Sequence, residues 1–284
     1  MYRFASSSNQ TNFRSQTELS NDTIARYAPS VLANEAHSSR GEKYTFIPTI
    51  KVIDALRLEG FQPFEVRQTK VRSAHRRDHT KHMVRLRHAS SLMTNDEVPE
   101  IVLLNSHDGS SSYQLLSGVF RFVCSNGLIA GDIFSDIRVR HHGNVVDNVI
   151  EGATRVLENT EQIMSRIDTY KAITLNDAEA TVFANAALHL RWEEDKAPVT
   201  AEGLLATSRY QDAKPDLWTT FNRVQENMIK GGVPGRSARG RRMTTRGVAG
   251  VNENVKLNRA LWTLADQFAK LKSNVVEIEE LMAA

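Results

Sequence analysis

The chain has one cysteine, Cys124, and it has no long uninterrupted apolar run. A single cysteine excludes an intrachain disulfide, which suits a reducing compartment. A transmembrane helix needs about 18 or more consecutive apolar residues, so its absence argues against a membrane span. Residues 1–23 lack the apolar centre of a secretory signal. We therefore expect a cytoplasmic protein without membrane association.

Acidic residues are scarce in two segments that are rich in lysine and arginine. The whole chain has a net charge of only +3, with 24% charged and 40% hydrophobic residues, as is ordinary for a globular protein. Residues 65–90 hold eight lysines and arginines against Glu65 and Asp78, a local charge of 8 − 2 = +6. Residues 231–247 hold five arginines and no acid. Such clusters are typical of proteins that bind a polyanion, and the alternative is a solvated charged face.

Two segments alternate apolar and polar residues as β-strands do, and this alternation places arginines on one side of a predicted sheet. Arg85 and Arg87 alternate with Val84 and Leu86, and a similar pattern runs over residues 61–73. We expect an exposed basic sheet surface here and a flexible arginine-rich loop at residues 232–248. The candidate nucleic-acid-binding residues are Arg67, Lys70, Arg72, Arg76, Arg77, Lys81, Arg85, Arg87, Arg236, Arg239, Arg241 and Arg242.

Hydrophobic periodicity predicts an α+β fold with an N-terminal helix, an antiparallel β-sheet, a long helix and a helical C-terminal half. The helix covers residues 50–60, and the period becomes helical again from residue 144, with a capping-box pattern at Asn176 and Glu179. Between them, residues 112–128 favour a strand, although a helix stays open. We divide the chain into a polar mobile leader (1–39), an α+β core with basic strands and a long helix (40–170), and a helical region with a basic loop (171–284).

The histidines do not form a metal-binding pattern. His75, His79 and His82 have helical spacing, but their segment is predicted to be a loop, and neighbouring Arg76 and Arg77 oppose a dication. The glycine-containing segments also lack the spacing of a phosphate-binding loop. We therefore expect no metal and no cofactor.

The segment LLNSHDGSSS gathers residues that could serve an enzyme. His107 and Asp108 could act as base and acid, with a serine or Cys124 as nucleophile, but no glycine-flanked serine elbow is present. A structural interpretation competes with this one, because Asn and Asp side chains fix tight turns and DG between β-type runs is a turn signal. A buried cysteine is usually inert. We expect turn-forming roles here, and catalysis stays open.

The segments KYTFIPTIKVIDALRLEGFQPF, LLNSHDGSSSYQLLSGVFRFVCSNGL and DLWTTFNRVQENMIKGG resemble a phage- and plasmid-like family catalogued as domain of unknown function 932. The resemblance covers residues 40–271 and is closest to the enterobacterial prophage members. It implies a mobile-element origin and a bacterial cytoplasm, and it implies no particular activity. Its most specific residues are Asn105, His107, Asp108, Gly109, Cys124, Asn126 and Gly127.

A weaker resemblance concerns the order of elements. A helix, three antiparallel strands and a long helix are also the core of the single-strand annealing recombinases, which hold single-stranded DNA in a basic groove on an oligomeric ring. The predicted elements at 50–60, 61–73, 80–89, 100–106 and 144–167 follow that plan. An order of elements does not fix a function.

These observations favour a non-enzymatic, homo-oligomeric protein of a prophage or plasmid that binds nucleic acid. Single-stranded DNA is the expected partner, and annealing in recombination is the expected process. The alternatives are a metal-independent hydrolase or nuclease that uses the His107 and Asp108 region, and an interaction protein that blocks a host defence system.

Overall fold

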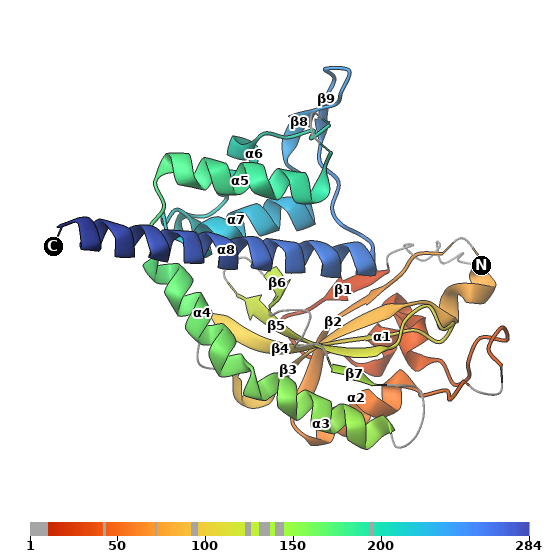
Figure 1. The fold of residues 1–284 in the computed structure, drawn as a ribbon. Helices are drawn as coiled ribbons and strands as arrows, with labels where there is room; N and C mark the ends of the chain where they lie inside the picture. The colour runs from red at the N-terminus through yellow and green to blue at the C-terminus, as the bar shows by residue number, and fades with distance from the viewer. Residues whose placement is uncertain are drawn as a thin grey trace. The chain divides into compact units, whose positions relative to one another are not determined.

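The computed structural model describes residues 11–41, 44–71, 73–91, 96–122, 126–130, 137–139, 145–193 and 196–283 (Figure 1). The chain forms two units. Unit 1 comprises Met1–Val119, Ser135–Glu158 and Ala249–Val251, and unit 2 comprises Phe120–Phe134, Asn159–Val248 and Asn252–Ala284.

Unit 1 combines a β-sheet with helices. Its strands are β1 (Asn12–Arg14), β2 (Phe61–Gln68), β3 (His82–His88), β4 (Glu97–Asn105), most of β5 (Tyr113–Arg121) and β7 (Ile137–Val139). Its helices are α1 (Asn21–Tyr27), α2 (Thr49–Leu58) and α3 (Val145–Glu158), with short 3₁₀ turns η1 (Pro29–Leu32), η2 (Ala74–His79) and η3 (Ala89–Ser91). The strand order is β1–β2–β3–β4–β5–β6, where β6 is Asn126–Ile129, and β7 pairs with β5. The pairs β1–β2, β2–β3, β3–β4 and β5–β7 are antiparallel.

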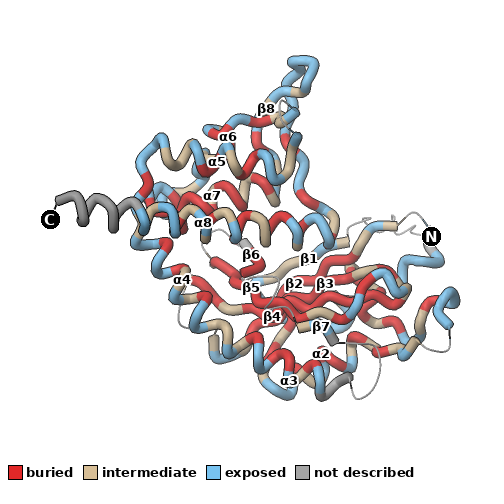
Figure 2. Tube along the Cα trace, in the orientation of Figure 1, coloured by how far each residue is buried: buried red, intermediate tan, exposed pale blue. Residues whose placement is uncertain are grey.

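One face of this sheet forms the hydrophobic core of unit 1. Val66, Val84 and Leu86 alternate inward on β2 and β3, and all three are buried. The apolar sides of α1, α2 and α3 pack on the same cluster, which makes the helices and the sheet two layers (Figures 1 and 2). Alternation therefore fixes which strand residues face the helices.

The opposite face of β2, β3 and β4 carries charged side chains that are buried rather than exposed. Glu65 lies directly across from Arg85 in the β2–β3 register, and its Oε2 also accepts a 2.8 Å bond from Arg14 Nε on β1. On β4, Glu100 accepts from Arg85 Nη1 at 2.7 Å and from Arg87 Nε at 2.8 Å. Burial alone would raise the pKa of Glu65, but the neighbouring guanidinium groups, Arg14 first, outweigh burial and lower that pKa to about 2.

This arrangement corrects the prediction of an exposed basic sheet surface. Arg67, Arg85 and Arg87 are 6%, 1% and 0% exposed, and each is paired with Glu65 or Glu100. The alternation of residues predicts the strands correctly, but it does not show whether the polar face of a strand is exposed to solvent. A buried, paired guanidinium is not available to a phosphate, so these three residues leave the candidate interface.

The prediction of a polar mobile leader is wrong for the described residues 11–39. Asn12–Arg14 form a strand that pairs with β2, and Ser20 caps α1 by accepting a bond from the Thr23 amide. Ile24 and Val31 are fully buried in the core of unit 1. The apolar residues in this segment are few, and they are the ones that anchor it.

Unit 2 is mainly helical. Its helices are α4 (Thr160–Ala172), α5 (Asp177–Arg191), α6 (Ala201–Leu205), α7 (Leu217–Lys230) and α8 (Val251–Ala283), with a 3₁₀ turn η5 (Tyr210–Asp212). Its core is aromatic: Phe221 of α7 stacks on Trp218 with ring centres 5.5 Å apart, and Trp262 of α8 lies edge-on to Phe221 at 6.3 Å. The hydroxyl of Tyr170 on α4 donates to Asp266 of α8. The predicted capping box of Asn176 and Glu179 is confirmed at the start of α5.

Two predicted elements differ from the structure. The long helix over residues 144–167 is two helices, α3 and α4, which are interrupted at Asn159, a residue type with low helix propensity. The basic loop at 232–248 contains an antiparallel hairpin of β8 (Pro234–Arg236) and β9 (Arg242–Thr244). Gly240, at a φ of 74°, supplies the left-handed conformation that its turn requires.

The predicted α+β class is confirmed. None of the helices in the described residues combines the length and the apolar character needed to cross a lipid bilayer. The division of the sequence at residues 40 and 171 stays a prediction.

The charge network of the sheet generates a stability prediction. We expect Glu100→Gln to lower the free energy of unfolding by about 3–5 kcal/mol, because it removes the carboxylate of Arg87 and leaves Arg85 with its longer contact to Glu65 alone. Urea titration followed by circular dichroism measures the change. Glu151→Gln is the matched control, since its pair with Arg155 is 62% exposed on both sides, and such a pair contributes roughly 0–1 kcal/mol. Equal losses in the two variants would contradict the network's role.

Candidate nucleic-acid interface

The predicted basic residues of unit 1 that remain accessible lie around η2. Lys70, Arg76 and Arg77 are exposed, and Lys81 is half-buried. The backbone carbonyl of Arg77 accepts bonds from Gln68 Nε2 at 2.7 Å and from the Thr80 hydroxyl at 3.2 Å, which fixes the end of this turn against β2. Arg72 lies outside the described residues. This turn therefore presents exposed cations on a backbone held by buried partners.

Three histidines gather beside these cations. The ring of His37 lies 5.7 Å from that of His75 and 5.3 Å from that of His79, measured between ring centres. Desolvation, together with the positive fields of His79 and Arg76, lowers the pKa of His37. Among the described residues, no group of three histidine, cysteine or acidic side chains is arranged to hold a metal ion.

The motif at residues 105–109 takes part in a buried polar cluster of unit 1. Asn105 Nδ2 donates to Thr49 Oγ1 at 3.0 Å, and the same hydroxyl lies 2.9 Å from His82 Nε2 and 3.4 Å from His107 Nε2. The two imidazole rings are 5.3 Å apart. On its other side, His82 Nδ1 lies 2.9 Å from Ser30 Oγ. Hydrogen bonds from α2, β3, β4 and η1 therefore converge on one threonine and one histidine.

Asp108 and Gly109 form the turn that follows β4, as the sequence predicts. Asp108 Oδ1 accepts a 2.9 Å bond from the Ser110 amide, and Gly109 has a φ of 75°. Burial raises the pKa of Asp108, but its hydrogen bonds with Ser110 outweigh burial and lower the pKa overall. A side chain at position 109 would also meet Arg40, whose Nη1 lies 2.2 Å from the place of a Cβ atom. The requirement for glycine here comes from its positive φ, since the Arg40 atom is the end of an exposed, flexible side chain that can move aside.

This geometry gives the catalytic alternative little support. His107 is 0% exposed, so a substrate does not reach its imidazole, and the partly exposed Asp108 accepts a bond within its own turn. Cys124 lies outside the described residues, and only the backbone of Asn126 is described. Gly127 in β6 accepts a 3.4 Å bond at its carbonyl from Gln225 of α7. The described residues of the motif take part in contacts that shape the turn and the buried cluster.

The β8–β9 hairpin of unit 2 presents the other predicted basic residues. Arg236, Arg239, Arg241 and Arg242 are all exposed, and Arg246 beyond β9 is exposed too. Within the described part of the chain, none of the five is ion-paired. Arg236 Nη1 donates to the Gly240 carbonyl at 3.2 Å across the turn. We call residues 234–244 the arginine hairpin.

The register of the arginine hairpin places like charges side by side. Arg236 is directly opposite Arg242, next to the pair of Gly235 and Met243. Like charges directly opposite each other destabilise a strand pair. The hairpin thus keeps a locally unfavourable arrangement at two exposed positions.

Sequence reasoning missed several residues that shape these surfaces. Arg14, Thr49 and Ser30 complete the buried networks from segments distant in sequence, and no local pattern marks them. Lys196 also escaped notice, although it lies beside the arginine hairpin. A lone lysine after an acidic stretch carries no signal of its own in a sequence.

Comparisons with known proteins agree with the resemblance seen in the sequence. The profile of the family described as "Domain of unknown function (DUF932)" matches residues 36–262. Two proteins of Escherichia coli (strain K12), UPF0380 protein YfjQ and UPF0380 protein YafZ, are each 49% identical to the chain over 267 residues, which covers 94% of this chain and 97% of theirs. No solved structure matches the chain.

The buried histidines generate a prediction about pH. Burial first, and then the nearby His107, lowers the pKa of His82 well below its ordinary value of 6.5. Above pH 6.5 the histidine is neutral in both the folded and the unfolded chain, so it does not oppose folding. Below pH 6.5 the unfolded chain binds a proton that buried His82 does not bind, and the free energy of unfolding therefore falls as the pH falls. We expect the unfolding free energy to drop between pH 6.5 and 5 with a slope of up to about 1.4 kcal/mol per pH unit from this residue.

The measurement is a series of urea titrations at pH 8, 7, 6 and 5. His82→Gln should reduce the slope below pH 6.5, because the titrating group is gone. His189→Gln, at an exposed position on α5, is the matched control and should keep the slope of the wild type. An unchanged slope in His82→Gln would refute the assignment.

Proposed function

The chain belongs to the DUF932 family, and we propose that it is a nucleic-acid-binding protein whose main contact surface is the arginine hairpin. The observation that carries the proposal is the pair of Arg236 and Arg242, two exposed guanidinium groups held opposite each other in a hairpin that has no acid. A polyanion would turn this unfavourable pair into a favourable site, since each phosphate offers a charge-assisted acceptor to a guanidinium group.

The treatment of arginines elsewhere in the protein supports this. Arg85 and Arg87 are paired with Glu100, and Arg121 and Arg209 are both paired with Asp212. Each of these four arginines is thus accompanied by a carboxylate. The arginine hairpin departs from that pattern, and local departures from stable design are expected where a surface serves binding.

A hairpin is also a suitable shape for this partner. Two-stranded ribbons and arginine-rich loops are known to enter grooves or follow the backbone of nucleic acids. Here the strands are three residues each, so the exposed arginines span a short, narrow ridge. Phosphate contacts from such a ridge give affinity without sequence preference.

The cations around η2 in unit 1 offer a second surface of the same chemistry. Lys70, Arg76 and Arg77 are exposed there, as the sequence predicts. Their contribution can be measured apart from that of the arginine hairpin, because the two sets can be substituted separately.

The test is a fluorescence-anisotropy titration of a labelled 20-nucleotide single strand and the matching duplex at 50 and 200 mM KCl. We expect wild-type affinity to fall steeply with salt, because bound phosphates release counterions. Changing Arg236, Arg239, Arg241 and Arg242 together to Ala should lower the slope of log affinity against log salt by roughly 0.7 per lost contact on a single strand, about 3 in all.

The matched control changes Lys51, Lys214, Lys256 and Lys270 to Ala. These lysines are exposed and lie outside both basic surfaces, and their removal changes the net charge by the same four units. We expect this control to keep most of the wild-type salt slope. If the wild type binds neither oligonucleotide at 50 mM KCl, or if both quadruple variants lose affinity equally, the proposed function is wrong.

A further inference from the structure

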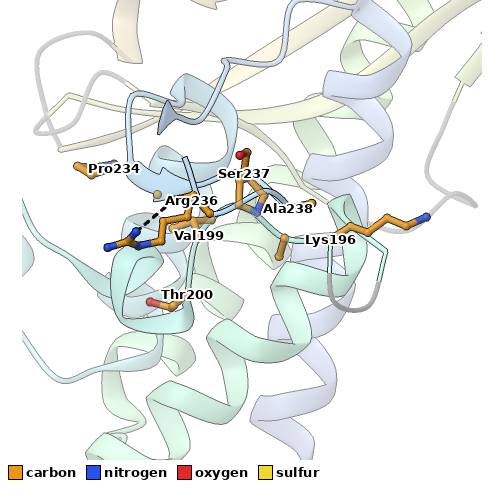
Figure 3. A pocket seen from close by; sticks show the side chains of 11 residues that line it. Lys196, Val199, Thr200, Pro234, Arg236, Ser237 and Ala238 are labelled. Atoms are coloured by element: carbon orange, nitrogen blue, oxygen red, sulfur yellow. Dashed lines mark hydrogen bonds between the residues drawn. The ribbon is translucent and has the colours of Figure 1, made fainter. Parts of the chain in front are cut away.

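A cavity of about 540 Å³ lies at the base of the arginine hairpin, within unit 2. Its lining comes from residues 196–200, just before α6, and from residues 234–240 of the hairpin (Figure 3). Small-molecule sites commonly have volumes of about 300–1,000 Å³, so this hollow is large enough for a compact organic group.

The walls of the cavity are fixed by a close backbone approach. The Arg236 amide donates to the Pro198 carbonyl at 2.7 Å. A Cβ atom at Gly235 would lie only 1.9 Å from that same carbonyl oxygen, so the two segments approach as closely as they do because position 235 has no side chain. Two prolines, Pro198 and Pro234, add conformational restriction. The cavity is therefore preformed by contacts among its own walls.

The lining combines apolar groups with two cations. Ala197, Pro198, Val199, Pro234 and Ala238 contribute the apolar part. Figure 3 shows the Lys196 and Arg236 side chains extending in opposite directions, with Val199 and Ala238 drawn between them. Lys196 is paired with Glu193, but both side chains are largely exposed, and an exposed pair of this kind is weak enough to exchange for another anion.

We propose that this cavity receives one unstacked base of a single-stranded nucleic acid, while Lys196 and Arg236 bind the phosphates on either side of that base. The inference rests on the proposed function and adds to it a preference for single strands. Pockets that hold an unstacked base are lined by aromatic or apolar side chains, and Pro198, Val199 and Pro234 give this cavity an apolar wall. Arg239 and Arg241 continue the phosphate path along the hairpin.

A duplex cannot use the cavity in this way. Its bases are stacked and paired, and extruding one costs unstacking and unpairing energy. A duplex would still contact the exposed arginines through its phosphates. The single strand and the duplex should therefore show the same salt-dependent contribution to affinity. Only the single strand should gain the further affinity that the cavity supplies.

The test fills the cavity without changing charge. Ala197→Leu/Ala238→Leu places two larger apolar side chains in the lining, and Ala206→Leu/Ala213→Leu is the control, because both of its alanines are exposed in unit 2 and lie outside the cavity. Affinities for an oligothymidine 20-mer and for a duplex of equal length are measured by anisotropy at 100 mM KCl. Urea midpoints confirm that both double variants are folded.

We expect the filled-cavity variant to bind the single strand roughly fivefold more weakly, the low end of the loss for one base contact because the lining is apolar without an aromatic ring, and to bind the duplex as the wild type does. A single strand with 2-aminopurine at its centre gives a second measurement. Its fluorescence should rise on binding to the wild type and to the control, because the base leaves its stacked neighbours, and should rise less with the filled cavity.

The outcomes separate this inference from the proposed function. Binding of both oligonucleotides by the wild type, with no effect of the filled cavity on either affinity or fluorescence, overturns the cavity's role and leaves the arginine hairpin as a phosphate-binding surface. Equal loss for single strand and duplex also overturns it. If thymidine 5′-monophosphate displaces the labelled 20-mer at a concentration as low as that of the unlabelled 20-mer, the cavity binds a free nucleotide, and the proposal that it binds a single strand is wrong. Absence of any binding by the wild type defeats both proposals.

Discussion

Unit 1 depends on two buried carboxylates, Glu65 and Glu100, that hold arginines together on one face of its sheet. Glu65 of β2 joins Arg14 of β1 and Arg85 of β3, and Glu100 of β4 binds Arg85 and Arg87 of β3. The four strands β1, β2, β3 and β4 are therefore joined by charge as well as by their backbone ladders. Buried ion pairs of this kind are costly to break, and they fix one arrangement of the side chains. The short strand β1 is part of this arrangement through Arg14, which explains why the N-terminal segment is anchored to the sheet.

The same amino acid has two roles in this chain, and the neighbouring carboxylates distinguish them. In the sheet, arginines alternate with core residues and meet Glu65 and Glu100 across the strands. In the arginine hairpin, they follow one another without an acid and face solvent. Both segments are rich in arginine. Only the folded partners show that the arginines of the first are buried and paired and that those of the second face solvent.

Much of the fold could be predicted from the sequence, and the failures have a common physical origin. Periodicity located α2, β2, β3 and β4, and the capping residues located the start of α5. Periodicity describes a side chain relative to its own element, whereas burial depends on what covers that element. That is why the polar face of β3 was taken for a surface. The Thr49 and His82 cluster could not be predicted either, because its members come from four separate segments and meet only in the folded chain.

The contact between Gly235 and Pro198 has a mechanical consequence. It attaches the base of the arginine hairpin to the segment before α6 through one backbone hydrogen bond and one close backbone approach. Arg236 adjoins this attachment, whereas Arg239 and Arg241 follow it by three and five residues in the chain. Arg236 therefore has the same backbone anchor as the base of the hairpin, and the two later arginines reach a partner from the turn. A polymer that binds here would be aligned at the base of the hairpin and accommodated towards its tip.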